Sequence, residues 1–207
     1  MNKKSLSVIV GTSLATQLVA TAAVSFVKIT NDSDSGISSA NSYTHAIDFG
    51  VNNADTTING VTFNKYTTGA NGTLNFSAAY SAGSALDMFQ NNNHGVTGQL
   101  ANLMQDMIFN NGNTVDSTAT WTLSGLTAGM TYETRIYTRT WASSAAERDA
   151  TIVFDHDGAG AVSVSAGRIN QDNATESPVG LGNFNDAYYI SYTYTALADE
   201  DLVITAT

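Results

Sequence analysis

Short runs in which apolar and polar residues alternate constrain the fold of this chain more than any other feature. Alternation with a period of two predicts β-strands, because successive side chains of a strand point to opposite faces. Asn-Gly and Asp-Gly pairs between the runs tolerate the backbone angles of tight hairpin turns. Strands are expected at 24–29, 43–49, 57–66, 73–78, 117–124, 130–141, 149–155, 161–167, 187–196 and 202–207. The pattern predicts an all-β fold, a two-sheet antiparallel β-sandwich with the wiring of a jelly roll.

Only one segment follows helical spacing. In QLANLMQDMIF, residues 99–109, apolar side chains recur three, four, seven and eight positions after Leu100. This spacing places them along one side of a helix. We therefore expect at most one short helix, around 99–109, lying on the sandwich.

The predicted core follows from the same alternation. The 207 residues include 43% hydrophobic residues and no cysteine, so packing and hydrogen bonds must hold the fold without disulfides. The inward positions are Ile47, Phe49, Val61, Phe63, Trp121, Leu123, Tyr132, Ile136, Ile152, Phe154, Val162, Val164, Ile190, Tyr192, Tyr194, Leu202 and Ile204. Trp121 is assigned to this core because it alternates in phase with Leu123.

The N-terminus resembles an export signal. Lys3 and Lys4 precede an apolar run from Leu6 to Val19, and the small residues Ala20-Thr21-Ala22 follow it. Residues 1–22 are therefore predicted to be a signal peptide, and 23–207 a single sandwich domain that is secreted or held at the cell surface. The alternative, a retained membrane anchor, is disfavoured because the run is shorter than the ~20 apolar residues needed to span a bilayer.

The net charge disfavours anionic partners. Lys and Arg total 8 against 18 Asp and Glu, which gives a formal net charge of -10. Such an excess of negative charge repels the phosphates of nucleic acids and of anionic membranes. Neither nucleic acid nor, after removal of the signal, a membrane is expected as a partner.

The run at 130–141 carries the main candidate site. One face of this strand would carry Glu133, Arg135, Tyr137, Arg139 and Trp141. A sugar site needs an aromatic plane for the apolar face of a pyranose, and charged donors and acceptors for its hydroxyls. The alternative is a solvated sheet face on which the arginines stack on the aromatic rings for stability. Arg148, in the loop that follows, either completes the site or is an exposed loop charge.

Metal and catalytic chemistry have weaker signals. Asp155 and Asp157 flank His156 and are candidate calcium ligands, although Asp157-Gly158 is itself a hairpin turn pair. No cofactor is expected, with a structural calcium ion left open. The chain has no nucleophile-elbow, phosphate-loop or paired-cysteine motif, and we expect it not to be an enzyme.

Several stretches resemble a known superfamily. They are NGVTF at 59–63, WTLSGLTAGMTYETRIY at 121–137, RDATIVFDHDG at 148–158, YYISYTYTA at 188–196 and DLVITA at 201–206. Over about 43–207 the chain resembles galactose-binding-like jelly rolls, near their malectin-like and carbohydrate-binding-module branches, as in exported proteins of planctomycete and verrucomicrobial type. The resemblance implies a β-sandwich that binds sugar and has no catalytic activity. It also implies a further aromatic strand after 207, so either the chain is a fragment or a neighbouring copy supplies the last strand.

Two functional hypotheses follow. The first is an exported, non-catalytic carbohydrate-binding β-sandwich at the cell surface or outside the cell. The second is a structural subunit of an extracellular filament or surface layer, in which copies associate by β-strand addition. The expected partner is carbohydrate in the first case and another copy of the chain in the second.

Overall fold

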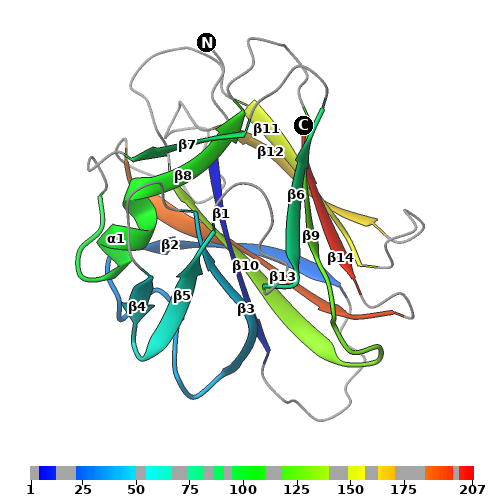
Figure 1. Ribbon diagram of the computed structural model, residues 1–207, viewed down its shortest axis with the longest axis horizontal. Coiled ribbons are helices and arrows are strands. Elements are labelled where there is room, and N and C mark those ends of the chain that lie inside the picture. Colours follow the sequence, from blue (N-terminus) through cyan, green and yellow to red (C-terminus); the bar gives the residue numbers. More distant parts are fainter. Residues whose placement is uncertain are drawn as a thin grey trace.

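The fold is built from two β-sheets that face each other (Figure 1). This computed structural model describes residues 5–12, 22–49, 55–66, 74–81, 86–90, 95–110, 118–139, 149–156, 163–170, 185–197 and 201–207. Strands dominate these segments, and the all-β sandwich predicted from the alternating pattern is confirmed.

The larger sheet has nine strands within the described part of the chain. Seven of them follow one another in the order β2 (Ala23–Ile29), β13 (Ala187–Thr195), β10 (Thr131–Arg139), β1 (Ser5–Thr12), β3 (Ser42–Asp48), β5 (Val61–Lys65) and β4 (Thr56–Ile58). The strand β8 (Asp106–Asn110) pairs with both β1 and β7 (Leu86–Gln90). One pair, β3 and β5, runs parallel, so the larger sheet of this predominantly antiparallel sandwich is mixed.

The smaller sheet has five strands, in the order β12 (Ser163–Asn170), β11 (Asp149–Asp155), β14 (Leu202–Ala206), β9 (Ala119–Leu123) and β6 (Phe76–Tyr80). From β9 onward the chain crosses repeatedly between the two sheets: β10 and β13 belong to the larger sheet, and β11, β12 and β14 to the smaller. Such crossing is the connectivity expected of a jelly roll.

The main core lies between the sheets. Every residue assigned to the core from the sequence is buried, apart from Val162, outside the described residues, and Val164, whose side chain is not described. Aromatic rings from both sheets stack there, with ring centroids 4.5 Å apart for Phe154 and Tyr192 and 5.1 Å apart for Tyr192 and Tyr194. Such offset pairs add to the gain from apolar burial.

A second core covers the opposite face of the larger sheet. It unites Tyr137 and Tyr189 of the sheet with residues of β4, β5 and the helix α1 (Leu100–Gln105). In α1 the buried residues are Leu100, Leu103 and Met104, in agreement with the predicted apolar side. The helix is shorter than the expected 99–109, however, because residues from Asp106 onward form β8 and pair with β1 and β7.

The strand boundaries follow the sequence closely. The expected strand at 57–66 is a hairpin in which Asn59 and Gly60 have φ angles of 49° and 80°, so this pair forms the turn that its residue types indicate. The other nine expected strands begin and end within three residues of observed ones. The pairs Asn71-Gly72, Asn111-Gly112 and Asp157-Gly158 lie outside the described residues.

β1 was not expected as a strand, because its residues lie within the predicted signal peptide 1–22. It pairs with β10 from Ser7 to Gly11 and with β3 from Ile9 to Thr12, antiparallel in both cases. A short apolar run suits an export signal and a buried strand equally, so periodicity cannot distinguish them. β1 is the central link of the larger sheet, because β10 and β3 have no ladder with each other in the described chain.

Candidate functional site

The four described residues of the predicted ligand row, Glu133, Arg135, Tyr137 and Arg139, alternate along β10 on the face turned away from the main core. The structure therefore brings these four together. Trp141 and Arg148 lie outside the described residues.

Burial divides the row into two halves. Tyr137 and Arg139 are fully buried, whereas the side chains of Glu133 and Arg135 remain 37% and 19% exposed. The expectation that all of these groups point outward together was wrong for Tyr137 and Arg139. The physical reason is a third layer that the strand pattern does not reveal: α1 and the polar loop at 30–38 cover this part of the sheet.

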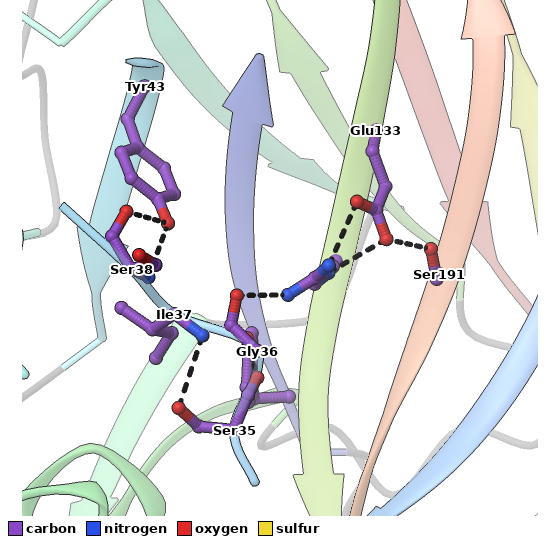
Figure 2. A network of polar contacts seen from close by, with 9 residues as sticks. Ser35, Gly36, Ile37, Ser38, Tyr43, Glu133 and Ser191 are labelled. Carbon is purple, nitrogen blue, oxygen red and sulfur yellow. Dashed lines mark hydrogen bonds and ion pairs between the residues drawn. The ribbon is translucent and has the colours of Figure 1, made fainter. Parts of the chain in front are cut away.

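Glu133 and Arg135 form a closed pair beside β13 (Figure 2). Arg135 donates from Nε and Nη2 to the two carboxylate oxygens of Glu133, at 2.8 and 2.9 Å, and Ser191 donates to Oε1 at 2.5 Å. Burial opposes ionisation of Glu133, but these hydrogen bonds and the Arg135 charge outweigh it and hold its pKa below the ordinary value. The guanidinium also lies 4.8 Å from the ring centre of Tyr189, which adds a cation–π contact.

Residues 30–38, here called the strap, are hydrogen-bonded to β10 on the face of the larger sheet that is turned away from the main core. The third donor of Arg135, Nη1, binds the carbonyl of Gly36 at 2.6 Å, and the hydroxyl of Tyr137 donates to the carbonyl of Ser35 at 2.7 Å. Burial raises the pKa of Tyr137, so this hydroxyl keeps its proton and remains a donor. Arg135 and Tyr137 therefore use these polar groups to hold the strap against β10.

The strap is also tied to β3 and to α1. The Tyr43 hydroxyl on β3 accepts from the amide of Ser38 and donates to its carbonyl, both at 3.0 Å. Asp32 accepts from the amides of Gln99 and Leu100, which caps the start of α1. Figure 2 shows the result: the strap passes from the strand that carries Tyr43 to the strand that carries Glu133, with the blue β1 between them.

Replacing Gly36 by Ala should loosen the strap. Gly36 has φ +71°, and a Cβ at this position would overlap the Arg135 guanidinium. A left-handed conformation costs an L-residue about 1–2 kcal/mol, and displacement of Arg135 adds to that cost. Gly129→Ala is the matched control, because Gly129 has φ +79° and, apart from its chain neighbours, no atom of the described residues lies within 4 Å of its Cβ position. In urea titrations Gly36→Ala should lose more free energy of unfolding than Gly129→Ala, and equal losses would contradict the role of Gly36.

Acid should weaken the Glu133–Arg135 pair. Because the pKa of folded Glu133 lies below the ordinary 4.5, the unfolded chain binds its proton first. The stability that Glu133 contributes is therefore present above pH 4.5 and is lost as the pH falls from there through the lower folded pKa. Glu133→Gln should show a flatter decline of unfolding free energy below pH 4.5 than the unchanged chain. Parallel declines would show that Glu133 is not coupled to folding.

Arg139 has a structural position at the end of the row. Its Nε donates to the carbonyl of Met104 at 3.2 Å, and Nη1 donates to the side-chain oxygen of Asn185 at 2.8 Å. Burial lowers the pKa of Arg139 to about 10, which still leaves it charged at neutral pH. The side chain thus joins α1 to the turn before β13.

The candidate calcium ligands are not gathered into a site that the structure describes. Asp155 lies half-buried at the end of β11, and Asp157 is outside the described residues. Among the described residues no three His, Cys, Asp or Glu side chains are grouped as metal ligands. His156 instead shares a hydrogen bond with the Tyr192 hydroxyl at 2.7 Å.

The sequence indicated the strap only by its composition. Its polar residues identify 31–41 as a loop long enough to carry function, but period-two patterning says nothing about which face such a loop covers. Asp32 was missed as a helix cap because it lies far along the chain from α1, and capping is recognised only from neighbouring residues.

Comparison with known proteins found no matching family model, no matching curated protein and no matching solved structure. The resemblance to galactose-binding-like sandwiches therefore stays a prediction. In the described segments, no helix combines the length and the apolar character needed to cross a membrane.

Proposed function

We propose that this protein is an exported, non-catalytic structural subunit whose copies associate by β-strand addition. The observation that carries the proposal is that β1 is formed by residues of the predicted signal peptide. This strand links β10 to β3 at the centre of the larger sheet, yet its residues belong to the segment whose sequence is typical of a removable export signal. Removal of 1–22 would empty the position between β10 and β3, which we call the β1 slot.

An empty β1 slot would be costly. The slot faces β10 at Ile136 and Tyr137, which are fully buried, and β3 runs along its other side. Backbone amides and carbonyls left there without partners cost about 1–3 kcal/mol each when water cannot reach them. An extended strand from outside would satisfy both flanking strands at once.

The strap supports a slot that stays open. It is bound to β3 through Tyr43 and to β10 through Arg135, and it crosses over β1 between them. These contacts join the strap to both strands that flank β1, namely β3 and β10. The slot walls are therefore expected to remain in place after the signal is removed.

The experiment uses protein expressed from the full-length gene and collected after export. Its first residue is determined, and its mass is measured by light scattering over a range of concentrations. We expect a chain that begins after Ala22 or Ala23 and a mass that grows with concentration. A monomer at every concentration would contradict the proposal, and so would retention of 1–22.

A synthetic peptide with the sequence of residues 5–12, SLSVIVGT, provides a specific test of the slot. Added in excess, it should occupy the slot of each copy and dissociate the assemblies into monomers. A peptide of the same composition in scrambled order is the control, since its alternation no longer matches the two faces of the slot.

Carbohydrate binding is the second candidate function. Glu133 and Arg135 remain partly exposed, and a carboxylate and a guanidinium are groups that sugar sites use, although here they already bond each other and Arg135 covers the Tyr189 ring. Tyr137 and Arg139 cannot take part while the strap and α1 cover them. Trp141 and Arg148 would have to supply the remaining contacts.

Calorimetry against a panel of polysaccharides tests the second function. A lone module should bind with Kd in the micromolar to millimolar range, roughly -4 to -8 kcal/mol. Trp141→Ala and Glu133→Gln should each weaken that binding. The absence of binding to every polysaccharide would remove this candidate and leave the structural function untouched.

A further inference from the structure

We infer that the strand which enters the β1 slot is β2 of a second copy, released from its own β13 like an arm. This inference rests on the proposed function and specifies its partner. The known position of β2, at one edge of the larger sheet, supplies the first argument.

An edge strand gains by moving to a central slot. Among the described residues β2 pairs along one side, with β13 from Ala187 to Thr193. In the slot a strand pairs along both sides, as β1 does with β10 and β3. The exchange therefore replaces one hydrogen-bonded ladder by two, and the newly bare edge of β13 costs less because an edge can be solvated.

β2 is also held lightly where it lies. Ala23, Ser25, Val27 and Lys28 are exposed, with Val27 at 36%, although Val is normally a core residue. The ion pair of Lys28 with Asp186 is exposed and contributes about 0–1 kcal/mol. Ile29 is the one fully buried residue of β2, and Val24 and Phe26 are half-buried against the main core, so the exchange must carry these two side chains into an equivalent environment.

The chain just after β2 is anchored independently. The carboxylate of Asp34 accepts hydrogen bonds from the amides of Thr30 and Asn31, and Asp32 caps α1. None of these contacts involves β2. Residues 23–28 can therefore leave as an arm that turns at Ile29 and Thr30, while the strap continues to bridge the slot walls.

The alternation of β2 suits the slot. Slot positions opposite Ile136 and Thr134 share the face of the main core, and the position opposite Arg135 shares the face below the strap. Val24 and Phe26, two residues apart and already packed against the main core, can take the first two positions, with the small Ser25 between them. The seven residues of β2 exceed the five of β1 that pair with β10.

A reversible disulfide tests whether β2 must leave β13. Ser25 and Ser191 are directly paired across β2 and β13, a spacing that suits a disulfide, and the chain has no cysteine of its own. The double variant Ser25→Cys with Ser191→Cys is expressed from the full-length gene and collected after export. It is oxidised at low protein concentration, and its mass is measured by light scattering with and without a reductant. We expect monomers when oxidised and assemblies when reduced.

The control is Ser25→Ala with Ser191→Ala, which removes the same Ser191 hydrogen bond to Glu133 but cannot be locked. It should assemble in both conditions. Assemblies of the cysteine variant in both redox states would overturn the role of β2 and leave assembly through the slot standing. Monomers in both states, for the cysteine variant and the unchanged chain alike, would overturn the proposed function as well.

Discussion

Replacing Tyr192 by Ala should lower the free energy of unfolding by about 3–5 kcal/mol, the range for loss of a large aromatic residue from a core. Tyr192 is fully buried and stacks between Phe154 and Tyr194, at centroid distances of 4.5 and 5.1 Å. Its hydroxyl also bonds the Nδ1 atom of His156 at 2.7 Å. Removing the ring breaks contacts with both sheets, because Phe154 belongs to the smaller sheet and Tyr194 to the larger.

Two smaller changes separate the parts of this effect. Tyr192→Phe keeps the ring and loses only the hydrogen bond to His156, so it should cost about 0.5–1.5 kcal/mol. Tyr188→Phe is the matched control: the Tyr188 hydroxyl is buried with no hydrogen-bond partner in the described structure, and its removal should cost nothing or stabilise. Equilibrium unfolding in urea measures all three. A loss below about 1 kcal/mol for Tyr192→Ala would contradict its place in the inter-sheet stack.

Replacing Arg139 by Met should cost about 2–4 kcal/mol, since hydrogen bonds from a buried charged donor are worth about 1.5–3 kcal/mol each and methionine keeps most of the volume. Arg139 is fully buried, and its two donors reach Met104 on α1 and Asn185 before β13. Met cannot replace either bond, so the Met104 carbonyl and the Asn185 side chain lose their partner.

The same unfolding measurement distinguishes this role from that of a solvated face. Lys28→Met removes a cation from an exposed ion pair and should change stability by less than about 1 kcal/mol. If Arg139→Met were as mild as Lys28→Met, Arg139 would be accessible to solvent after all. That result would restore the outward-facing arginine row that the sequence predicts.

The strands and the main core could be predicted from the sequence because both depend on local alternation. Trp121 is an example: its phase with Leu123 identifies it as a core residue, and it is 3% exposed. The Asn59-Gly60 turn could be predicted equally well, since both residue types suit the positive φ angles that it has.

The candidate site was less predictable because two neighbours of β10 come from distant parts of the chain. Alternation identifies the residues that share the second face of β10, but not what covers that face. The strap begins about a hundred positions before Arg135, and its contacts are mostly to backbone carbonyls, such as that of Gly36, which leave no signature in the sequence. Tyr137 and Arg139 therefore have the residue types of a binding row and the burial of a core.

The central claim is that the β1 slot exists and is filled by a strand from another copy once the signal is gone. Amide hydrogen exchange of β10 in the exported protein tests it most directly, because alternate residues of 133–137 direct their amides toward β1, while the intervening amides are directed toward β13 and serve as an internal control. At concentrations where assemblies form, the amides directed toward the slot should exchange slowly. They should exchange fast when dilution removes the neighbouring copy, and the SLSVIVGT peptide, but not its scrambled control, should restore their protection. Equal protection in isolated monomers, without peptide and without residues 1–22, would show that β10 and β3 close on each other and would contradict the account.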